Sequence, residues 1–363
     1  DVTKVKEKEF RATFEIKGKA LDPKLDVLFA MMREILMESK LGDEKRLKEI
    51  LSMLKTRLQT SFLSAGHTTA VLRSLSYTSP IARFRDITSG IGFYEVVKDL
   101  EENFEERKEL LIENLKKIAG RIFRKENLML SYTSAQEGLA VLEKAVPQFA
   151  DSLHTGEKES HGQCIIHCKK RNEGFRTSSK VQYVARTGNF IDGGAEYTGA
   201  LQILKVILSY DYLWQNVRVK GGAYGCMSGF KRSGESYFVS YRDPHLRRTL
   251  EVYEGVPEYV RTFAADEREM TKYIIGTISG KDVPRTPQTQ GALGRMAYFR
   301  GLTVEMLQKE RDQILNATVE DIHALAPLIQ AVLSDDQLCV LGSENAIEKA
   351  KDVFMETKPL VSC

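Results

Sequence analysis

The sequence predicts an α+β protein of two similar domains, each with helices packed on one face of a mainly antiparallel sheet. Short segments such as residues 9–16 alternate apolar and polar side chains, which is the period of a half-buried strand. Elsewhere, as over residues 25–58, apolar residues recur every three or four positions, which is typical of amphipathic helices. The order strand, run of helices, strand, helix occurs in both parts of the chain and favours helices layered on a sheet.

The first predicted domain covers residues 1–155. Its most regular part is a helical hairpin over about residues 24–75. Ser79-Pro80 opens the next helix, because proline fits the first turn, where its missing N–H leaves no hydrogen bond unmade. The remaining expected elements are a charged helix at about 103–123, a strand at 128–132, and a helix at 136–149 that breaks near Pro147.

The second predicted domain covers residues 156–363. Residues 151–179 are rich in His, Gly, Lys, Glu and Ser, and we interpret them as a linker. The order of strands and helices in the first domain then recurs, although the sequence shows no residue-level repeat. The expected elements are a strand at 180–185, a long helix at about 196–216, strands at 224–230 and 235–241, several helices over 244–333, a strand at 338–341 and a helix at 345–354.

Composition excludes several classes of function. The 53 basic and 50 acidic residues give a formal net charge of +3 and are interspersed, so nucleic acid and anionic membranes are not expected partners. No apolar run approaches the roughly 18–20 residues that span a bilayer, and no signal peptide is recognisable. Five scattered cysteines favour a reducing compartment, such as bacterial cytoplasm or an organelle matrix. Because residue 1 is Asp and not Met, we expect a piece of a longer protein, although a cleaved tag or processing would leave the same trace.

The most informative segment runs from Asn216 to Gly225. It places Arg218 and Tyr224 on either side of the glycine pair Gly221-Gly222, where a helical pattern gives way to an alternating one. Glycines let backbone and ligand approach closely, a guanidinium binds carboxylates or carbonyls with a planar fork, and a phenol can donate to a developing oxyanion. A simpler alternative is a glycine pair that ends a helix, with a surface arginine and a packed strand tyrosine.

These residues resemble a known family. The segment from Arg218 to Gly225 is similar to the substrate-side motif of the presequence protease branch of the pitrilysin and insulin-degrading-enzyme family (the insulinase family, subfamily C of peptidase family M16). Members of that family are zinc metallopeptidases with an inverted H-x-x-E-H motif. The segments 240–244 (Ser-Tyr-Arg-Asp-Pro) and 285–291, and the hairpin over 24–75, also resemble that branch. The likeness covers essentially the whole chain.

The resemblance implies that this chain is the C-terminal half of a clamshell endopeptidase for short unfolded peptides. It implies that Arg218 and Tyr224 orient the substrate and stabilise the tetrahedral intermediate, with Gly221 and Gly222 in the substrate-binding segment. Zinc and its ligands would come from an N-terminal half, which is the implied partner besides the peptide. This chain has no H-x-x-E-H, so we expect it to hold no metal and to be inactive alone.

Other candidate sites have simpler interpretations. His161, Cys164, His167 and Cys168 could bind a metal, but strand alternation would send Cys164 to the face opposite both histidines. The glycine-containing segment 187–194 lacks the Gly-Lys-Ser/Thr of a phosphate loop and is expected to be a strand-to-helix turn. His67 is expected to cap or pack within the hairpin, and the aromatic residues Tyr237, Phe238 and Tyr241 to form core, with a binding platform as the alternative. The basic stretches 121–125 and 242–248 are expected to be solvated faces, with the alternative that they line an inner wall that attracts peptide carboxylates.

Two alternatives to the peptidase stay open. One is a non-catalytic scaffold or partner subunit of the same fold family. The other is a nucleotide-dependent enzyme that uses the glycine turns, for which we expect no measurable ATP binding. An upstream H-x-x-E-H segment in the same gene would favour the peptidase.

Overall fold

The computed structural model describes residues 2–6, 9–156 and 166–361 and divides into two compact units that interleave along the chain. We call them the helical unit (Asp1–Thr56, Glu95–Ile165 and Pro284–Gly301) and the sheet unit (Arg57–Tyr94, Ile166–Val283 and Leu302–Cys363). The predicted domain ranges 1–155 and 156–363 stay a prediction. By packing, residues 57–94 belong with the later part of the chain.

The helical unit has a small core between α1 and α7, in which the rings of Phe29 and Phe149 lie 5.1 Å apart. Its only sheet among the described residues is the antiparallel pair of β1 and β2. The elements that lie wholly in this unit are β1 (Val2–Lys6), β2 (Glu9–Ala12), α1 (Leu25–Met37), α6 (Phe104–Ile122), α7 (Gln136–Asp151) and α12 (Pro287–Arg300), with short 3₁₀ turns at Asp22–Lys24 and Lys125–Asn127. Helices α2 (Glu44–Ser64) and α5 (Ile91–Glu102) contribute residues to both units.

Two sequence predictions are wrong in the helical unit. The expected strand at 128–132 is irregular, because Leu128 and Tyr132 pack against the core between α1 and α7 instead of pairing with a strand. The expected break at Pro147 is absent, since α7 continues through it to Asp151 and buries Phe149. In both places tertiary packing overrides the local signal.

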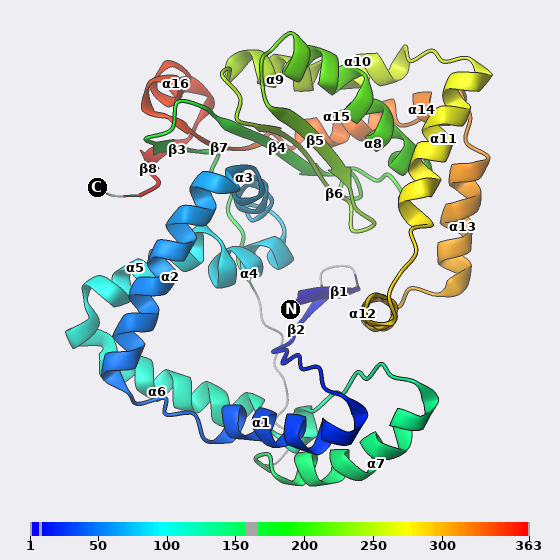
Figure 1. Cartoon of the computed structure of the whole chain (residues 1–363). Coiled ribbons are helices and arrows are strands. Elements are labelled where there is room, and N and C mark those ends of the chain that lie inside the picture. Colours follow the sequence, from blue (N-terminus) through cyan, green and yellow to red (C-terminus); the bar gives the residue numbers. More distant parts are fainter. Residues whose placement is uncertain (1, 7–8, 157–165, 362–363) are drawn as a thin grey trace. The chain divides into compact units, whose positions relative to one another are not determined.

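The sheet unit is built on six strands in the order β5-β6-β4-β7-β3-β8 (Figure 1). Neighbours from β5 to β7 are antiparallel, whereas β3 is parallel to both β7 and β8. The strands are β3 (Glu173–Thr177), β4 (Tyr183–Asn189), β5 (Gly225–Phe230), β6 (Glu235–Tyr241), β7 (Gln337–Ser343) and β8 (Glu356–Pro359). The helices are α3 (Gly66–Leu75), α4 (Pro80–Ser89), α8 (Ala200–Tyr210), α9 (Arg247–Glu254), α10 (Val256–Arg261), α11 (Glu267–Lys281), α13 (Val304–Leu315), α14 (Val319–His323), α15 (Ala326–Ser334) and α16 (Glu344–Lys349).

Alternate residues of the central strands point to opposite faces of this sheet. Val184 and Phe238 enter a large core with α8, α9, α10 and α15, whereas Tyr183 and Val239 enter a second core with α3. Figure 1 shows α3 on the other face of the sheet from α9 and α10. The predicted α+β class is therefore confirmed. The prediction of helices on one face is incomplete, because α3 covers part of the other.

Part of the predicted linker is strand β3, which lies between β7 and β8. The polar composition of this segment was misleading. Glu173 is fully buried in β3 because Arg73 of α3 binds its carboxylate, and Phe175 is buried beside it. A charge that is neutralised from a distant part of the chain leaves no local signal.

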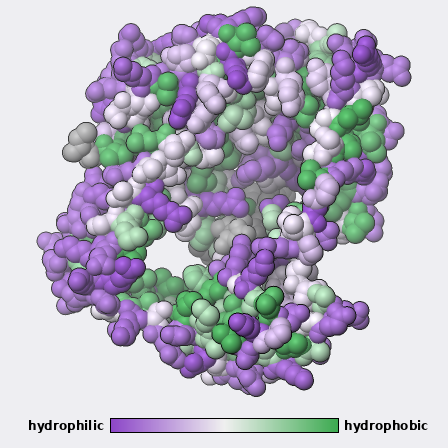
Figure 2. All heavy atoms as spheres, viewed as in Figure 1, coloured by the Kyte–Doolittle hydropathy of each residue, from purple (hydrophilic) through white to green (hydrophobic). Residues whose placement is uncertain are grey.

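Hydrophilic side chains cover most of the face shown in Figure 2, and hydrophobic residues form only small groups on it. Within the described ranges, no helix is both long enough and apolar enough to cross a membrane.

Candidate functional site

The predicted long helix at 196–216 is two elements, and the second carries the arginine. Helix α8 ends at Tyr210, and a π-helical turn, η3 (Trp214–Val219), follows. The turn closes with hydrogen bonds from Gly222 N–H to Arg218 O (2.8 Å) and from Ala223 N–H to Val217 O (3.2 Å). Each bond is one residue wider than in the usual glycine-terminated helix end, which fits a π-helical turn. Such turns are frequent at functional sites.

The two glycines are needed for different reasons. A Cβ on Gly221 would lie 2.3 Å from the Val217 carbonyl oxygen, so a side chain would push the turn apart. Gly222 has φ +77°, in the left-handed region that favours glycine, while its nearest side-chain neighbour would be 3.6 Å away. Gly221 is buried and Gly222 is exposed. The pair therefore turns the chain sharply from η3 into β5.

The Arg218 guanidinium is exposed and stacked on an aromatic ring. Its Cζ lies 4.0 Å from the ring centroid of Trp214, four residues earlier on the same turn. It also lies 5.9 Å from the ring centroid of Tyr224. Stacking of a guanidinium on indole is favourable and limits the positions that the guanidinium can take.

Tyr224 is 66% exposed, so it is not the packed strand tyrosine of the simpler alternative. Its N–H donates to Tyr241 O (3.1 Å), and its ring meets the Tyr241 ring edge-to-face at 5.7 Å. No other described residue donates to or accepts from the Tyr224 hydroxyl. The sequence-predicted residues Arg218 and Tyr224 thus lie together, exposed, on one side of the sheet unit.

Tyr241, for which the sequence favours a core position over a binding platform, continues an aromatic layer beside the site. His67, at the start of α3, lies 4.8 Å from the Tyr241 ring and 6.4 Å from the Tyr183 ring. The Tyr183 hydroxyl donates to Leu63 O (2.8 Å). Burial lowers the pKa of His67, and its Nδ1 has no hydrogen-bond partner among the described residues. His67 thus packs against tyrosines of the sheet and not only within its hairpin.

Among the described residues, no three His, Cys, Asp or Glu side chains come together to hold a metal. His161 and Cys164 lie outside the described residues, so their predicted arrangement is not tested. Burial raises the pKa of the neighbouring Cys168 thiol, which opposes the thiolate form that binds metals. The described residues do not fit a zinc ion, and we derive no zinc-dependent step from them.

The other sequence candidates are structural. Residues 187–194 form the end of β4 and a turn before α8, as predicted, and a Cβ on Gly188 would collide with the Val332 carbonyl oxygen at 2.0 Å. Phe238 is fully buried, as expected for a core residue, whereas Tyr237 and Tyr241 are half-buried.

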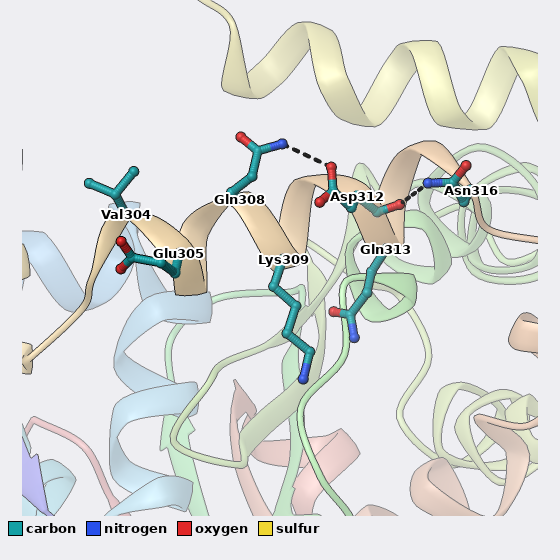
Figure 3. Close-up of a pocket in the computed structure, with 7 residues that line it drawn as sticks. All are labelled: Val304, Glu305, Gln308, Lys309, Asp312, Gln313 and Asn316. Atoms are coloured by element: carbon teal, nitrogen blue, oxygen red, sulfur yellow. Dashed lines mark hydrogen bonds between the residues drawn. The ribbon is translucent and has the colours of Figure 1, made fainter.

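A hollow of about 680 Å³ lies elsewhere, along α13 (Figure 3). All of its lining residues come from this one helix and its C-terminal end, between Val304 and Asn316. Gln308 and Asn316 donate to the Asp312 carboxylate and carbonyl, respectively, at 2.8 Å each. A hollow lined by one helix face is a shallow surface, so we place the candidate site at Arg218 and Tyr224.

Sequence families match both ends of the chain. The family described as PreP C-terminal domain matches residues 172–343, which include the Arg218–Tyr224 segment. A second family, described as associated with subfamily C of the M16 peptidases, matches residues 2–100. The fold and these matches together define a class, the M16 metallopeptidases.

Curated relatives place the chain in one family within the M16 metallopeptidases. Protein HypA of Clostridium perfringens is 39% identical over 358 residues, covering 98% of this chain and 36% of the relative. Presequence protease 1, chloroplastic/mitochondrial, of Arabidopsis thaliana is 28% identical over 347 residues, covering 94% and 32%. The chain spans about a third of the length of these relatives. It belongs to the presequence protease family, within subfamily C of the M16 peptidases, and carries the C-terminal domain of that family.

Solved structures agree on the fold. A conserved protein from Enterococcus faecalis V583 matches with a TM-score of 0.57 at 13% identity, covering 88% of this chain and 74% of the other. Pitrilysin matches with a TM-score of 0.52 at 12% identity, covering 88% and 33%. At these identities the likeness concerns the fold alone.

Proposed function

We propose that this chain is the substrate-holding part of a zinc metalloendopeptidase that degrades short unstructured peptides. One observation carries the proposal: in a chain of the presequence protease family, an exposed guanidinium (Arg218) and an exposed phenol (Tyr224) lie together beside an aromatic layer. The zinc site would belong to an N-terminal half, the proposed partner, so this chain alone would not cleave peptides.

Tyr224 would act on the peptide carbonyl. Its free hydroxyl can donate a hydrogen bond to the carbonyl oxygen, and this bond strengthens as negative charge develops on that oxygen. The backbone bond from Tyr224 N–H to Tyr241 O and the packing against the Tyr241 ring hold the phenol in place before the peptide arrives. A donor that is already in position loses little freedom on binding.

Arg218 would hold the peptide backbone or balance the charge of the intermediate. Stacking on Trp214 leaves the N–H edge of the guanidinium available while restricting its motion. The exposed Gly222 would let a peptide backbone pass close to the turn, and Gly221 would contribute by permitting the tight turn itself. These assignments keep the four sequence-predicted residues in one site.

The proposal is tested by mixing this chain with a zinc-bearing N-terminal half and assaying cleavage of an unfolded peptide, with each part alone as the control. We expect cleavage only in the mixture. In the mixture, Tyr224→Phe should lower kcat by about 10²–10³ with little change in KM, because the lost bond matters most in the transition state. Equal turnover by the variant and the parent would remove Tyr224 from the mechanism.

The scaffold alternative has a different outcome in the same assay. A scaffold would associate with the N-terminal half without supporting cleavage, and Tyr224→Phe would leave that association unchanged. Cleavage by the N-terminal half alone, at the rate of the mixture, would likewise favour the scaffold.

A further inference from the structure

Arg242 has a strained backbone beside the candidate site. Its φ of +50° lies in the left-handed region, which non-glycine residues rarely adopt. Its carbonyl oxygen, with that of Tyr241, lies within reach of the Tyr224 N–H, at 3.4 and 3.1 Å. Strain of this kind persists only where the surroundings fix it, and it gathers at functional sites.

The residues after Arg242 hold this conformation. The Asp243 carboxylate is fully buried and accepts hydrogen bonds from Thr249 Oγ1 (2.6 Å) and from His245 N–H (2.9 Å). The Asp243 backbone exchanges two hydrogen bonds with Gln182, of 2.7 and 2.9 Å. Hydrogen bonds with Thr249, His245 and Gln182 thus fix Asp243, so the neighbouring backbone of Arg242 has little freedom to leave its left-handed conformation.

The Arg242 side chain lies at the surface beside the Tyr183 hydroxyl, and no described carboxylate binds it. The adjacent Asp243 carboxylate is already occupied, as described above. Elsewhere in the sheet unit, exposed arginines do find acids, as Arg311 does with both oxygens of Asp282 at 2.6 and 2.8 Å. Arg218 resembles Arg242 in having no acid partner in the described part of the chain.

Arg242 lies beside the ring that follows Tyr224 in the aromatic layer. Its Cζ is 5.5 Å from the Tyr241 ring centroid, and the Tyr241 and Tyr224 centroids are 5.7 Å apart. At about 3.3 Å per extended residue, the guanidinium is within about three residues of a peptide group bound at Tyr224. Each of two neighbouring tyrosines thus has a guanidinium near its ring.

We propose that Arg242 binds a carboxylate of the peptide that Arg218 and Tyr224 hold, within about three residues of the bound carbonyl. This role rests on the proposed function. A guanidinium without an acid partner binds a carboxylate through two parallel N–H bonds, which neither amides nor aliphatic groups can match. The carboxylate has two possible sources, an acidic side chain or the free C-terminus of the peptide, and both offer the same chemistry.

Peptide binding to this chain alone tests the role without any cleavage. Trp214 is the only tryptophan of the chain, and it stacks under Arg218, so its fluorescence reports on the site. The probes are unfolded nine-residue peptides that lack Trp and Tyr, with Glu or Gln at successive positions and with a free or amidated C-terminus. We expect the parent to bind the best acidic peptide about tenfold more tightly than its neutral counterpart.

Three variants separate the effect of losing the Arg242 guanidinium from any effect on the stability of the fold. Arg242→Gly removes the guanidinium and suits the left-handed backbone, so thermal unfolding should show it at least as stable as the parent. It should lose the tenfold preference, whereas Arg242→Lys should keep only part of it because an ammonium lacks the fork. Arg248→Gln, an exposed arginine of α9, is the matched control and should keep the preference.

Each outcome decides one question. Loss of the preference on amidation identifies the C-terminus as the source, and loss on a single Glu→Gln change identifies the side chain. If Arg242→Gly keeps the parent's preference while Arg218→Gln weakens binding, the role of Arg242 is wrong and the proposed function stands. If no peptide binds, or if Arg218→Gln binds every peptide as the parent does, the proposed function fails first.

Discussion

Glu173 offers a sharp test of what holds the sheet unit together. Its carboxylate is fully buried in β3 and accepts hydrogen bonds from Arg73 Nε (2.5 Å), Arg73 Nη2 (2.9 Å) and the Tyr77 hydroxyl (3.1 Å). Lys358 Nζ lies 3.0 Å from the same carboxylate. Arg73 in turn binds the buried Asp86 at 2.7 Å. These groups join α3 and α4 to the parallel part of the sheet.

The lowered pKa of Glu173 gives the size of its contribution to the free energy of unfolding. Burial alone would raise that pKa, but the bonds and charges of Arg73 and Lys358 outweigh burial and lower it from 4.5 to about 2. A carboxylate with a lowered pKa stabilises the folded state above its unfolded pKa, and this contribution is lost as the pH falls towards the folded pKa. The difference corresponds to about 3 kcal/mol at pH 7, most of which should be lost by pH 3.

Glu173→Gln should therefore lower the free energy of unfolding by about 3 kcal/mol at pH 7, because it leaves Arg73 with one buried acid in place of two. Denaturant unfolding at pH 7 and pH 3 measures this, and the gap between variant and parent should shrink to about 1 kcal/mol at pH 3. Glu348→Gln, which breaks the exposed pair with Arg176, is the control and should cost under about 1 kcal/mol. A gap below about 1 kcal/mol at pH 7, or one that does not change with pH, would refute the reasoning.

The glycine pair yields the remaining predictions. Gly222→Ala should cost about 1–2 kcal/mol in thermal unfolding and Gly222→Asn less, since Asn tolerates a positive φ; equal costs would mean that backbone conformation is not the cause. Gly221→Ala should weaken peptide binding, because its Cβ would meet the Val217 carbonyl oxygen at 2.3 Å and displace the turn that carries Arg218. Gly194→Ala, at φ +82° with open space around it, is the control: it should cost similar stability to Gly222→Ala but leave binding intact.

Much of the fold could be read from periodicity. The strand expected at 235–241 is β6 (Glu235–Tyr241), and the one expected at 224–230 differs from β5 by one residue. Strand β3 was missed because its burial depends on Arg73, 100 residues earlier in the chain. The expected strand at 128–132 failed for the opposite reason, since an apolar segment can be buried without pairing.

The sequence predicts only part of the candidate site. Arg218 and Tyr224 stand out in sequence because a glycine pair separates them where two periods meet. The contact between Trp214 and Arg218 could have been predicted from the sequence, because residues four apart on a helical turn lie side by side. Arg242 stands out in sequence only as part of the basic stretch 242–248, because its nearness to Tyr224 comes from the pairing of β5 with β6, and its strain is visible only in the backbone angles.

The central claim is that Arg218 and Tyr224 act together on one bound peptide. A double-mutant cycle with Arg218→Gln and Tyr224→Phe tests it most directly, with kcat/KM for an unfolded peptide measured in the mixture with the zinc-bearing N-terminal half for the parent, both single variants and the double variant. Shared contact with one ligand predicts a coupling of at least about 0.5 kcal/mol between the two changes. Losses of kcat/KM whose free energies simply add, within about 0.3 kcal/mol, would contradict a joint site.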